Sequence, residues 1–133
     1  MIKNAFAKPI SASLEDYLEV IYEIFQEKQG VKAIEISRRL GVGRSSVTDA
    51  LKTLAYKKLV NYSRYDVISL TSQGEETAKE IISKHNILCE FLTDVLGISP
   101  EEADENACRM EHVISQNVSD SFVKFMKETR KDK

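Results

Sequence analysis

The sequence predicts an all-α dominated chain, with an N-terminal winged helix-turn-helix, a small β-hairpin wing and a C-terminal helical domain. Three observations support this fold class. Apolar residues recur at helical spacing along most of the 133 residues. A glycine turn, Gly41–Val42–Gly43, separates a short helical segment from a longer one, as in a helix-turn-helix. Two short β-rich segments, 59–62 and 67–70, follow directly and have the pattern of a hairpin.

Length and composition limit the classes of protein to consider. With 133 residues, 42% of them hydrophobic, the chain has room for one or two small domains with a modest core. No run of 18 apolar residues exists, so we expect no membrane partner. The first ten residues are not apolar enough for a signal peptide, and Cys89 and Cys108 make no disulfide framework. We therefore expect a reduced, cytoplasmic protein.

Charge is unevenly distributed along the chain. Residues 31–84 carry ten Lys and Arg against six Asp and Glu, a net charge of +4, although the whole chain has a net charge of −2. A basic middle with acidic ends predicts a central segment that meets polyanions and terminal segments that hold cations.

The first helix is predicted to begin at a capping box, Ser13 to Asp16, and to stop at Gly30. Its polar face carries Asp16 and Glu19, three residues apart. Helix capping for Asp16 and a solvated face for Glu19 are the simpler interpretations of these carboxylates.

The helix-turn-helix combines a helix over 33–40 with a second helix over 44–57. The N-terminal end of the second helix would enter the DNA major groove. The residues presented there are Arg44, Ser45, Ser46, Thr48, Asp49 and Lys52. A plain helical hairpin is the alternative, but basic and hydroxylic side chains followed by a wing favour DNA binding. At the wing tip, Arg64 and Tyr65 are expected to reach the DNA backbone or minor groove.

The C-terminal half begins with a long linking helix, about 72–96, which a capping box of Ser72 and Glu75 opens. His85 is the one polar residue on its apolar stripe, which by itself is more typical of a packed core residue. A helix capped by Ser99 then runs to about residue 114, and a last helix covers about 118–128. The apolar face of this last part, with Phe122, Phe125 and Met126, predicts dimerisation. We divide the chain into a DNA-binding domain, 1–73, and a metal-binding and dimerisation domain, 74–133.

A thiol, a carboxylate and an imidazole lie within one predicted helical turn, at Cys108, Glu111 and His112. At about 100° per residue they project within one sector of the helix. Sulfur, nitrogen and oxygen donors together suit Fe, Mn, Co, Ni or Zn better than Mg or Ca. A packed cysteine beside a solvated Glu-His pair is the alternative.

Two rival functions use the same residues. A metallohydrolase is suggested by the superficial similarity of Cys-x-x-Glu-His to a His-x-x-Glu-His zinc motif. It would need an open coordination position and a separate general base in a cleft, and a basic winged helix has no enzymatic purpose, so we expect no enzyme. A thiol-redox-responsive winged-helix regulator using Cys89 and Cys108 is the second rival, but it leaves the carboxylates and histidines unexplained.

Five segments resemble those of one family: 15–22 (EDYLEVIY), 45–48 (SSVT), 70–74 (LTSQG), 84–85 (KH) and 107–113 (ACRMEHV). The sequence resembles the diphtheria-toxin-repressor and manganese-transport-regulator family (DtxR/MntR) of metal-dependent bacterial repressors from Leu14 to about Lys127. The resemblance implies metal ligation by Asp16, Glu19, His85, Cys108, Glu111 and His112.

The implied ligand set is mixed. Asp16, Glu19 and His85 match the manganese-sensing branch, whereas Cys108 matches the iron-sensing branch, which has Met at position 16. Cys89 and Asp104 stand where the ancillary site of the iron-sensing branch has Glu and His. The chain ends before the SH3-like domain of that branch and so resembles the shorter two-domain members.

The resemblance implies a metal-ion-activated transcriptional repressor that controls metal uptake genes. It would bind operator DNA as a homodimer when Fe(II) or Mn(II) is bound, with Co(II), Ni(II) or Zn(II) as surrogates. The ion would join the first helix to the later helices and hold the two winged helices at one separation.

Overall fold

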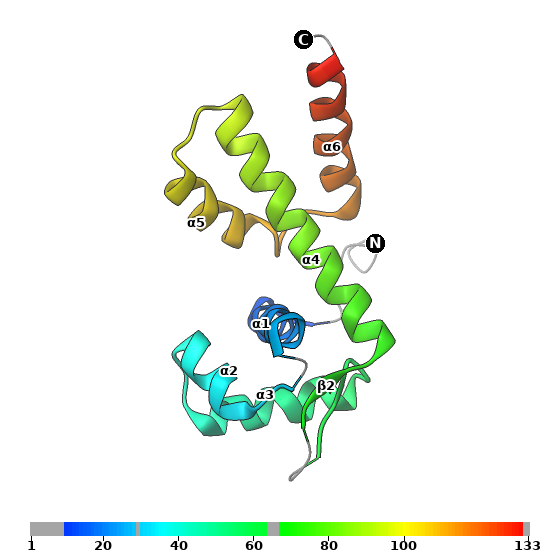
Figure 1. Ribbon diagram of the computed structural model, residues 1–133. Helices are drawn as coiled ribbons and strands as arrows, with labels where there is room; N and C mark the ends of the chain where they lie inside the picture. Colours follow the sequence, from blue (N-terminus) through cyan, green and yellow to red (C-terminus); the bar gives the residue numbers. More distant parts are fainter. Residues whose placement is uncertain (1–9, 29, 64–66, 132–133) are drawn as a thin grey trace, which may run out of the picture. The chain divides into compact units, whose positions relative to one another are not determined.

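The computed structural model describes residues 10–28, 30–63 and 67–131. The chain forms two compact units, divided between Glu80 and Ile81. The elements in chain order are α1 (Ala12–Lys28), α2 (Ala33–Leu40), α3 (Arg44–Tyr56), β1 (Val60–Asn61), β2 (Ser69–Leu70), α4 (Ser72–Glu90), the π-helix η2 (Phe91–Val95), α5 (Pro100–Met110) and α6 (Gln116–Lys131) (Figure 1). The mostly helical fold class with a small hairpin is confirmed. None of the described helices is both long and apolar enough to span a bilayer.

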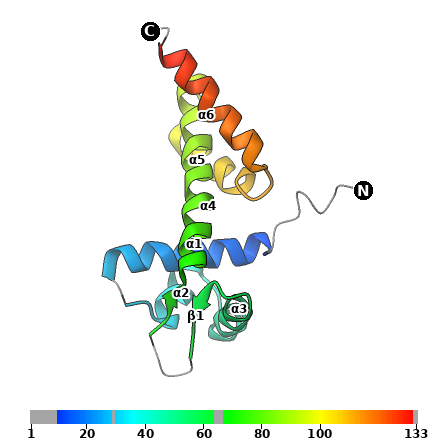
Figure 2. The same cartoon turned by 90° about the vertical axis from the view of Figure 1, so that its right-hand side faces the viewer.

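In the N-terminal unit, α1 crosses a layer made by α2, α3 and the hairpin (Figure 2). The core consists of aliphatic side chains that are completely buried: Leu18, Ile21 and Ile24 of α1, Ile36 of α2, and Val47, Leu51 and Leu54 of α3. Each such side chain contributes about 1.5–3 kcal/mol through burial. Since α3 places its apolar stripe inward, its opposite face is directed to solvent.

The turn between α2 and α3 has the form that the two glycines predict. Gly41 adopts a left-handed conformation, with φ of 66°, and its N–H donates to the carbonyl of Ser37 at 2.9 Å. Only glycine takes this conformation without steric cost. Gly43 is the N-cap of α3. This tight connection fixes the first residue of α3 at Arg44.

The hairpin is shorter than the predicted strands. Two antiparallel pairs, Val60↔Leu70 and Asn61↔Ser69, form the ladder. Ile68 instead donates its N–H to the carbonyl of Val31, at 3.1 Å, so the second strand also pairs with the segment before α2. The predicted wing-tip residues, Arg64 and Tyr65, lie outside the described residues.

Two predicted helix starts are displaced by one or two residues. The hydroxyl of Ser11, not that of Ser13, accepts the N–H of Leu14 at 3.2 Å, so α1 begins earlier. The hydroxyl of Thr71, not that of Ser72, accepts the N–H of Gly74 at 3.0 Å at the start of α4. Asp16 therefore does not occupy the capping position that its simpler interpretation requires.

The C-terminal unit consists of the second part of α4, η2, α5 and α6. Figure 1 shows α5 and α6 on opposite sides of the α4 axis. The ring of Phe91 in η2 lies 4.7 Å from that of Phe122 and 6.1 Å from that of Phe125, centroid to centroid. On the other side, Ala103 and Ala107 of α5 are completely buried. These small side chains allow α5 to approach α4 closely.

Two helix ends in this unit also differ from prediction. The long helix closes in a π-helical turn, in which Leu96 donates its N–H to the carbonyl of Phe91 at 3.3 Å. The helix predicted to reach residue 114 ends at Met110 and passes into a turn. Lys84 donates to the carbonyl of Ile114, at 3.3 Å, and so fastens this turn to α4. Glu111 and His112 are consequently turn residues.

Candidate metal centre

A histidine–glutamate pair joins α4 to the end of α5. Nδ1 of His85 lies 2.7 Å from Oε1 of Glu111. The Glu111 side chain is fully buried, and that of His85 is 15% exposed. Glu111 reaches this position because it is the C-cap of α5, with helical dihedral angles. A buried carboxylate is costly unless it is paired, and here the imidazole provides hydrogen bonding and charge.

The second nitrogen of the same ring faces a different pair of side chains. Nε2 of His85 lies 2.8 Å from Oδ1 of Asp104 and 3.4 Å from Sγ of Cys89. Cys89 is one turn beyond His85 on α4, and Asp104 is on the second turn of α5. The imidazole is therefore held from both ends.

These contacts change the proton affinities of the groups. The hydrogen bond to Glu111 is the largest cause of a pKa of about 9 for His85; burial opposes it, and Asp104 adds to it. The metal-free ring is therefore an imidazolium at neutral pH, with both N–H groups donating. Burial raises the pKa of the Cys89 thiol, with a further contribution from the negative charges of Asp104 and Glu111.

Donor atoms of three predicted ligands converge. Ligand atoms of His85, Cys108 and Glu111 all lie within 4.8 Å of one another. Nε2 of His112 lies 3.8 Å from Oε2 of Glu111, and the His112 side chain is only 10% exposed. Sulfur, imidazole and carboxylate donors fit a borderline divalent ion such as Fe(II), Mn(II) or Zn(II). This part of the predicted set is thus assembled within one unit.

A second group of donors shares the same histidine. Ligand atoms of His85, Cys89 and Asp104 also lie within 4.8 Å of one another. In the sequence, Cys89 and Asp104 are departures from a family pattern. The four-residue spacing of His85 and Cys89 indicates a shared helix face. The family resemblance groups Asp104 with Cys89 at one ancillary site, and the packing of α5 on α4 brings Asp104 to 2.8 Å from Nε2 of His85.

The two remaining predicted ligands lie on α1, in the N-terminal unit. Asp16 and Glu19 are both partly buried. Their three-residue spacing puts them on one face of the helix. They stay predicted ligands.

The predicted DNA-contacting residues begin at the N-terminus of α3. Arg44, Ser45, Ser46, Asp49 and Lys52 are exposed and Thr48 is partly buried. The hydroxyl of Thr48 donates to the carbonyl of Arg44 at 3.1 Å. These placements agree with an outward-facing recognition helix, while the contacts themselves stay a prediction.

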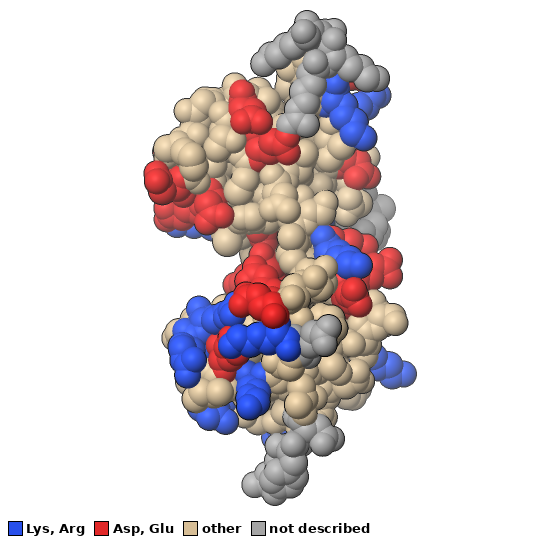
Figure 3. Space-filling model, in the orientation of Figure 1, with Lys and Arg blue, Asp and Glu red and all other residues tan. Residues whose placement is uncertain are grey.

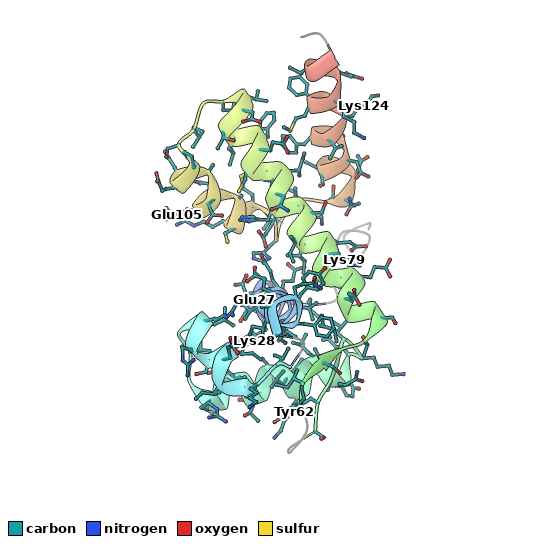
Figure 4. All side chains as sticks on the ribbon, in the orientation of Figure 1. Glu27, Lys28, Tyr62, Lys79, Glu105 and Lys124 are labelled. Carbon is teal, nitrogen blue, oxygen red and sulfur yellow. The ribbon has the colours of Figure 1, made fainter. Side chains whose placement is uncertain are left out.

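Basic and acidic side chains gather on different parts of the surface. Figure 3 shows Lys and Arg over the α2 side of the N-terminal unit and Asp and Glu over α5 of the C-terminal unit. Part of the basic group is engaged in ion pairs: Arg39 bonds both oxygens of Glu27 at 2.8 Å and Oε2 of Glu35 at 3.0 Å. Figure 4 labels Glu27 and Lys28 at the end of α1, and Glu105 on α5. Arg39 belongs to this basic surface, but its guanidinium is already bonded to Glu27 and Glu35 and is therefore less available to a phosphate.

Two family models match the chain. The model for the N-terminal DNA-binding domain of iron-dependent repressors matches residues 9–68. The model for the metal-binding and dimerisation domain of iron-dependent repressors matches residues 71–133. Together they span both units.

Similar proteins agree with the models. The HTH-type transcriptional regulator MJ0568 of Methanocaldococcus jannaschii is 39% identical over 125 residues, 93% of this chain and 99% of the relative. Transcriptional regulator MntR of Escherichia coli O6:H1 is 36% identical over 109 residues, 82% of this chain and 70% of the relative. The solved structure of the manganese regulator SloR superposes with a TM-score of 0.76 and 27% identity, over 86% of this chain. The match covers 53% of the SloR chain, so this protein spans about half the length of that structure.

The predicted resemblance to the DtxR/MntR repressors is confirmed, and with it the prediction that the chain is not an enzyme. The chain belongs to the family of iron-dependent repressors, with an N-terminal DNA-binding domain followed by a metal-binding and dimerisation domain.

Proposed function

We propose that this protein is a metal-activated transcriptional repressor that binds operator DNA as a homodimer when Fe(II) or Mn(II) is bound. The pair of the partly buried His85 and the fully buried Glu111, with Cys108 beside it, carries the proposal. It lies in a domain that matches a metal-binding family model, in a chain whose other domain matches a DNA-binding model. A repressor of this kind would act in the cytoplasm on metal uptake genes.

The residues of the pair are suited to exchange a proton for a metal ion. A bound divalent cation would supply the positive charge that the protonated His85 ring supplies in its absence. His85 would release the Nδ1 proton and offer its lone pair, while the Glu111 carboxylate would keep a positive partner throughout. Cys108 and His112 complete the donors that the C-terminal domain contributes to the proposed set.

Asp16 and Glu19 stay in the proposed ligand set as donors from α1. Neither residue is at the helix cap, since Ser11 takes that position. A cation that bound ligands from both domains would favour one arrangement of the winged helix over others. The cation can shift the equilibrium between these arrangements only by the difference between its binding free energies for them, and this difference limits its effect on DNA binding.

The identity of the metal is proposed from the donor set. Cys108 favours Fe(II), whereas the carboxylates of Asp16 and Glu19 favour Mn(II). The similar protein SloR is described as a manganese regulator, while the family models refer to iron. Anaerobic titration of DNA binding with Fe(II), Mn(II), Co(II) and Zn(II) separates these possibilities by their relative affinities.

We propose that a second copy covers the apolar groove between η2 and α6. Phe91, Val118, Phe122 and Phe125 line the groove, and Phe125 is 48% exposed. The family model for this domain includes dimerisation. Phe125→Glu should therefore yield a monomer in sedimentation at micromolar concentration, and Lys124→Glu, a neighbouring exposed position, should remain dimeric.

The experiment that tests the function uses operator selection. DNA selected from a random library with Mn(II) or Fe(II) present should bind the wild type and should lose affinity when EDTA is added. Glu111→Gln and His112→Ala should abolish the metal stimulation and leave the fold intact. Glu105→Gln is the control, because Glu105 is an exposed residue of the same helix paired only locally with Arg109 at 2.9 Å. Unchanged, metal-stimulated binding by Glu111→Gln would refute the proposal.

The thiol-redox alternative makes a different prediction. It requires DNA binding that responds to oxidant and not to metal. Cys89→Ser should abolish such a response, whereas a metal-activated repressor with this substitution should keep its metal stimulation.

A further inference from the structure

We propose that Asp104 is a positioning residue, which holds the His85 ring so that Nδ1, and not Nε2, is the nitrogen offered to the metal ion. This inference rests on the proposed metal centre. It concerns a residue outside the predicted ligand set.

The geometry of α5 aligns the two carboxylates that contact His85. Asp104, Ala107 and Glu111 have the spacing i, i+3, i+7 and so lie along one stripe at this end of the helix. Two carboxylates thus stand two turns apart with a small residue between them. Ala107 is completely buried. We infer that the methyl side chain leaves room for the His85 ring, whose nitrogens lie 2.7 Å from Glu111 and 2.8 Å from Asp104.

The chemistry of imidazole gives the two ring nitrogens different roles in a metal site. A neutral ring has one lone pair, which can bind a metal ion, and one N–H, which needs an acceptor. Metal-binding histidines almost always give that N–H to a carboxylate, a carbonyl or water, which fixes the ring and its tautomer. Each ring nitrogen of His85 faces a carboxylate, so the surroundings of the two carboxylates must determine which nitrogen binds the metal ion.

The two carboxylates differ in burial. The Glu111 side chain is fully buried, whereas that of Asp104 is 69% exposed. Water can solvate the negative charge of Asp104, whereas the Glu111 carboxylate is out of reach of solvent and needs a cation beside it. The cation should therefore bind on the Glu111 side, where Cys108 also has its ligand atom. Asp104 then accepts the remaining Nε2–H.

The opposite orientation is the competing possibility. Nε2 could bind the ion together with Cys89 and Asp104, whose ligand atoms also lie within 4.8 Å of it. In that case Nδ1–H would donate to Glu111, and Asp104 would be a direct ligand. The two orientations place the N–H on different nitrogens, which NMR distinguishes.

The experiment uses the full chain labelled with ¹⁵N-histidine and loaded with Zn(II), a diamagnetic probe. The expected ¹⁵N spectrum of the wild type shows His85 bound through Nδ1 and protonated at Nε2. Asp104→Ala should weaken Zn(II) binding about tenfold, the lower end of the range for outer partners of metal ligands. It should also increase the solvent exchange of the Nε2 proton, and Asp104→Asn, which keeps an acceptor oxygen, should restore part of the affinity.

Controls separate positioning from folding and from the metal centre itself. Glu105→Ala changes the next residue of α5, also exposed, and should leave both readouts unchanged. Metal bound at Nε2, or wild-type affinity and proton exchange in Asp104→Ala, would overturn the inference. Glu111→Gln tests the metal centre separately. If Glu111→Gln binds Zn(II) like the wild type, the proposed function fails. If Glu111→Gln loses Zn(II) binding while Asp104→Ala behaves like the wild type, only the positioning role of Asp104 is refuted.

Discussion

Nδ1 of His85 lies 2.7 Å from Oε1 of the completely buried Glu111. This contact raises the pKa of the His85 ring in the metal-free protein, and the rise can be measured. The ordinary histidine pKa of 6.5 rises to about 9, with Glu111 the largest cause. The folded state therefore binds the proton more tightly than the unfolded state does.

Stability of the metal-free protein should fall as pH rises. A raised folded-state pKa contributes stability that is complete below about pH 6.5 and disappears as pH rises through about 9. Urea unfolding in EDTA at pH 6.0, 7.5 and 9.0 measures this effect, expected to be on the order of 2 kcal/mol. Glu111→Gln should flatten the pH dependence. An equally steep dependence in this variant would contradict the assignment to the His85–Glu111 pair.

Metal binding should release a proton at neutral pH. His85 is protonated at pH 7.5 in the free protein, and a nitrogen that binds metal must lose its proton. Calorimetry with Zn(II) in buffers of different ionisation enthalpy should give a release of about one proton from this group. In Glu111→Gln the His85 contribution should shrink, because its pKa returns toward the ordinary value. Identical proton release in the two proteins would argue against His85 as a ligand.

The junction between the hairpin and α4 requires glycine for reasons of space. A Cβ added to Gly74 would lie 1.8 Å from the carbonyl oxygen of Leu59, which is backbone and cannot rotate away. Gly74→Ala should therefore destabilise the protein by about 1–3 kcal/mol, the usual cost of overpacking. Chemical denaturation measures the loss. Gly30→Ala is the matched control, because nothing lies within 4 Å of its Cβ position.

Local patterns predicted the helix-turn-helix because its determinants are local. Gly41 needs its left-handed conformation, and Val47, Leu51 and Leu54 follow a helical period that must face the core. Two helix starts differ from the prediction because two hydroxyl residues compete for the cap at each. Ser13 and Ser72 each have an acidic residue three positions on, as a capping box requires, but the hydroxyls of Ser11 and Thr71 accept the helix N–H groups instead.

Tertiary packing determines the end of α5 and the contacts of His85, which helical periodicity does not predict. Helical periodicity predicted α5 to about residue 114, but the chain leaves the helix after Met110 and Lys84 holds the turn. The motif predicts Glu111 and Cys108 as ligands and the family resemblance adds His85, yet neither shows which nitrogen of His85 faces which carboxylate. The contact of His85 with Asp104 joins residues 19 positions apart and depends on the packing of α5 on α4.

DNA binding should depend on Arg44 and not on Arg39, although both are arginines of the helix-turn-helix. Arg44 is exposed at the start of α3, where a phosphate contact would release counterions. Arg39 is held by Glu27 and Glu35 through three hydrogen bonds of 2.8–3.0 Å. Arg44→Ala should therefore weaken operator binding and lower the slope of log K against log salt by about one. Fluorescence anisotropy from 50 to 200 mM salt measures this slope. Arg39→Ala should retain the wild-type slope, and an unaltered slope in Arg44→Ala would remove Arg44 from the phosphate contacts.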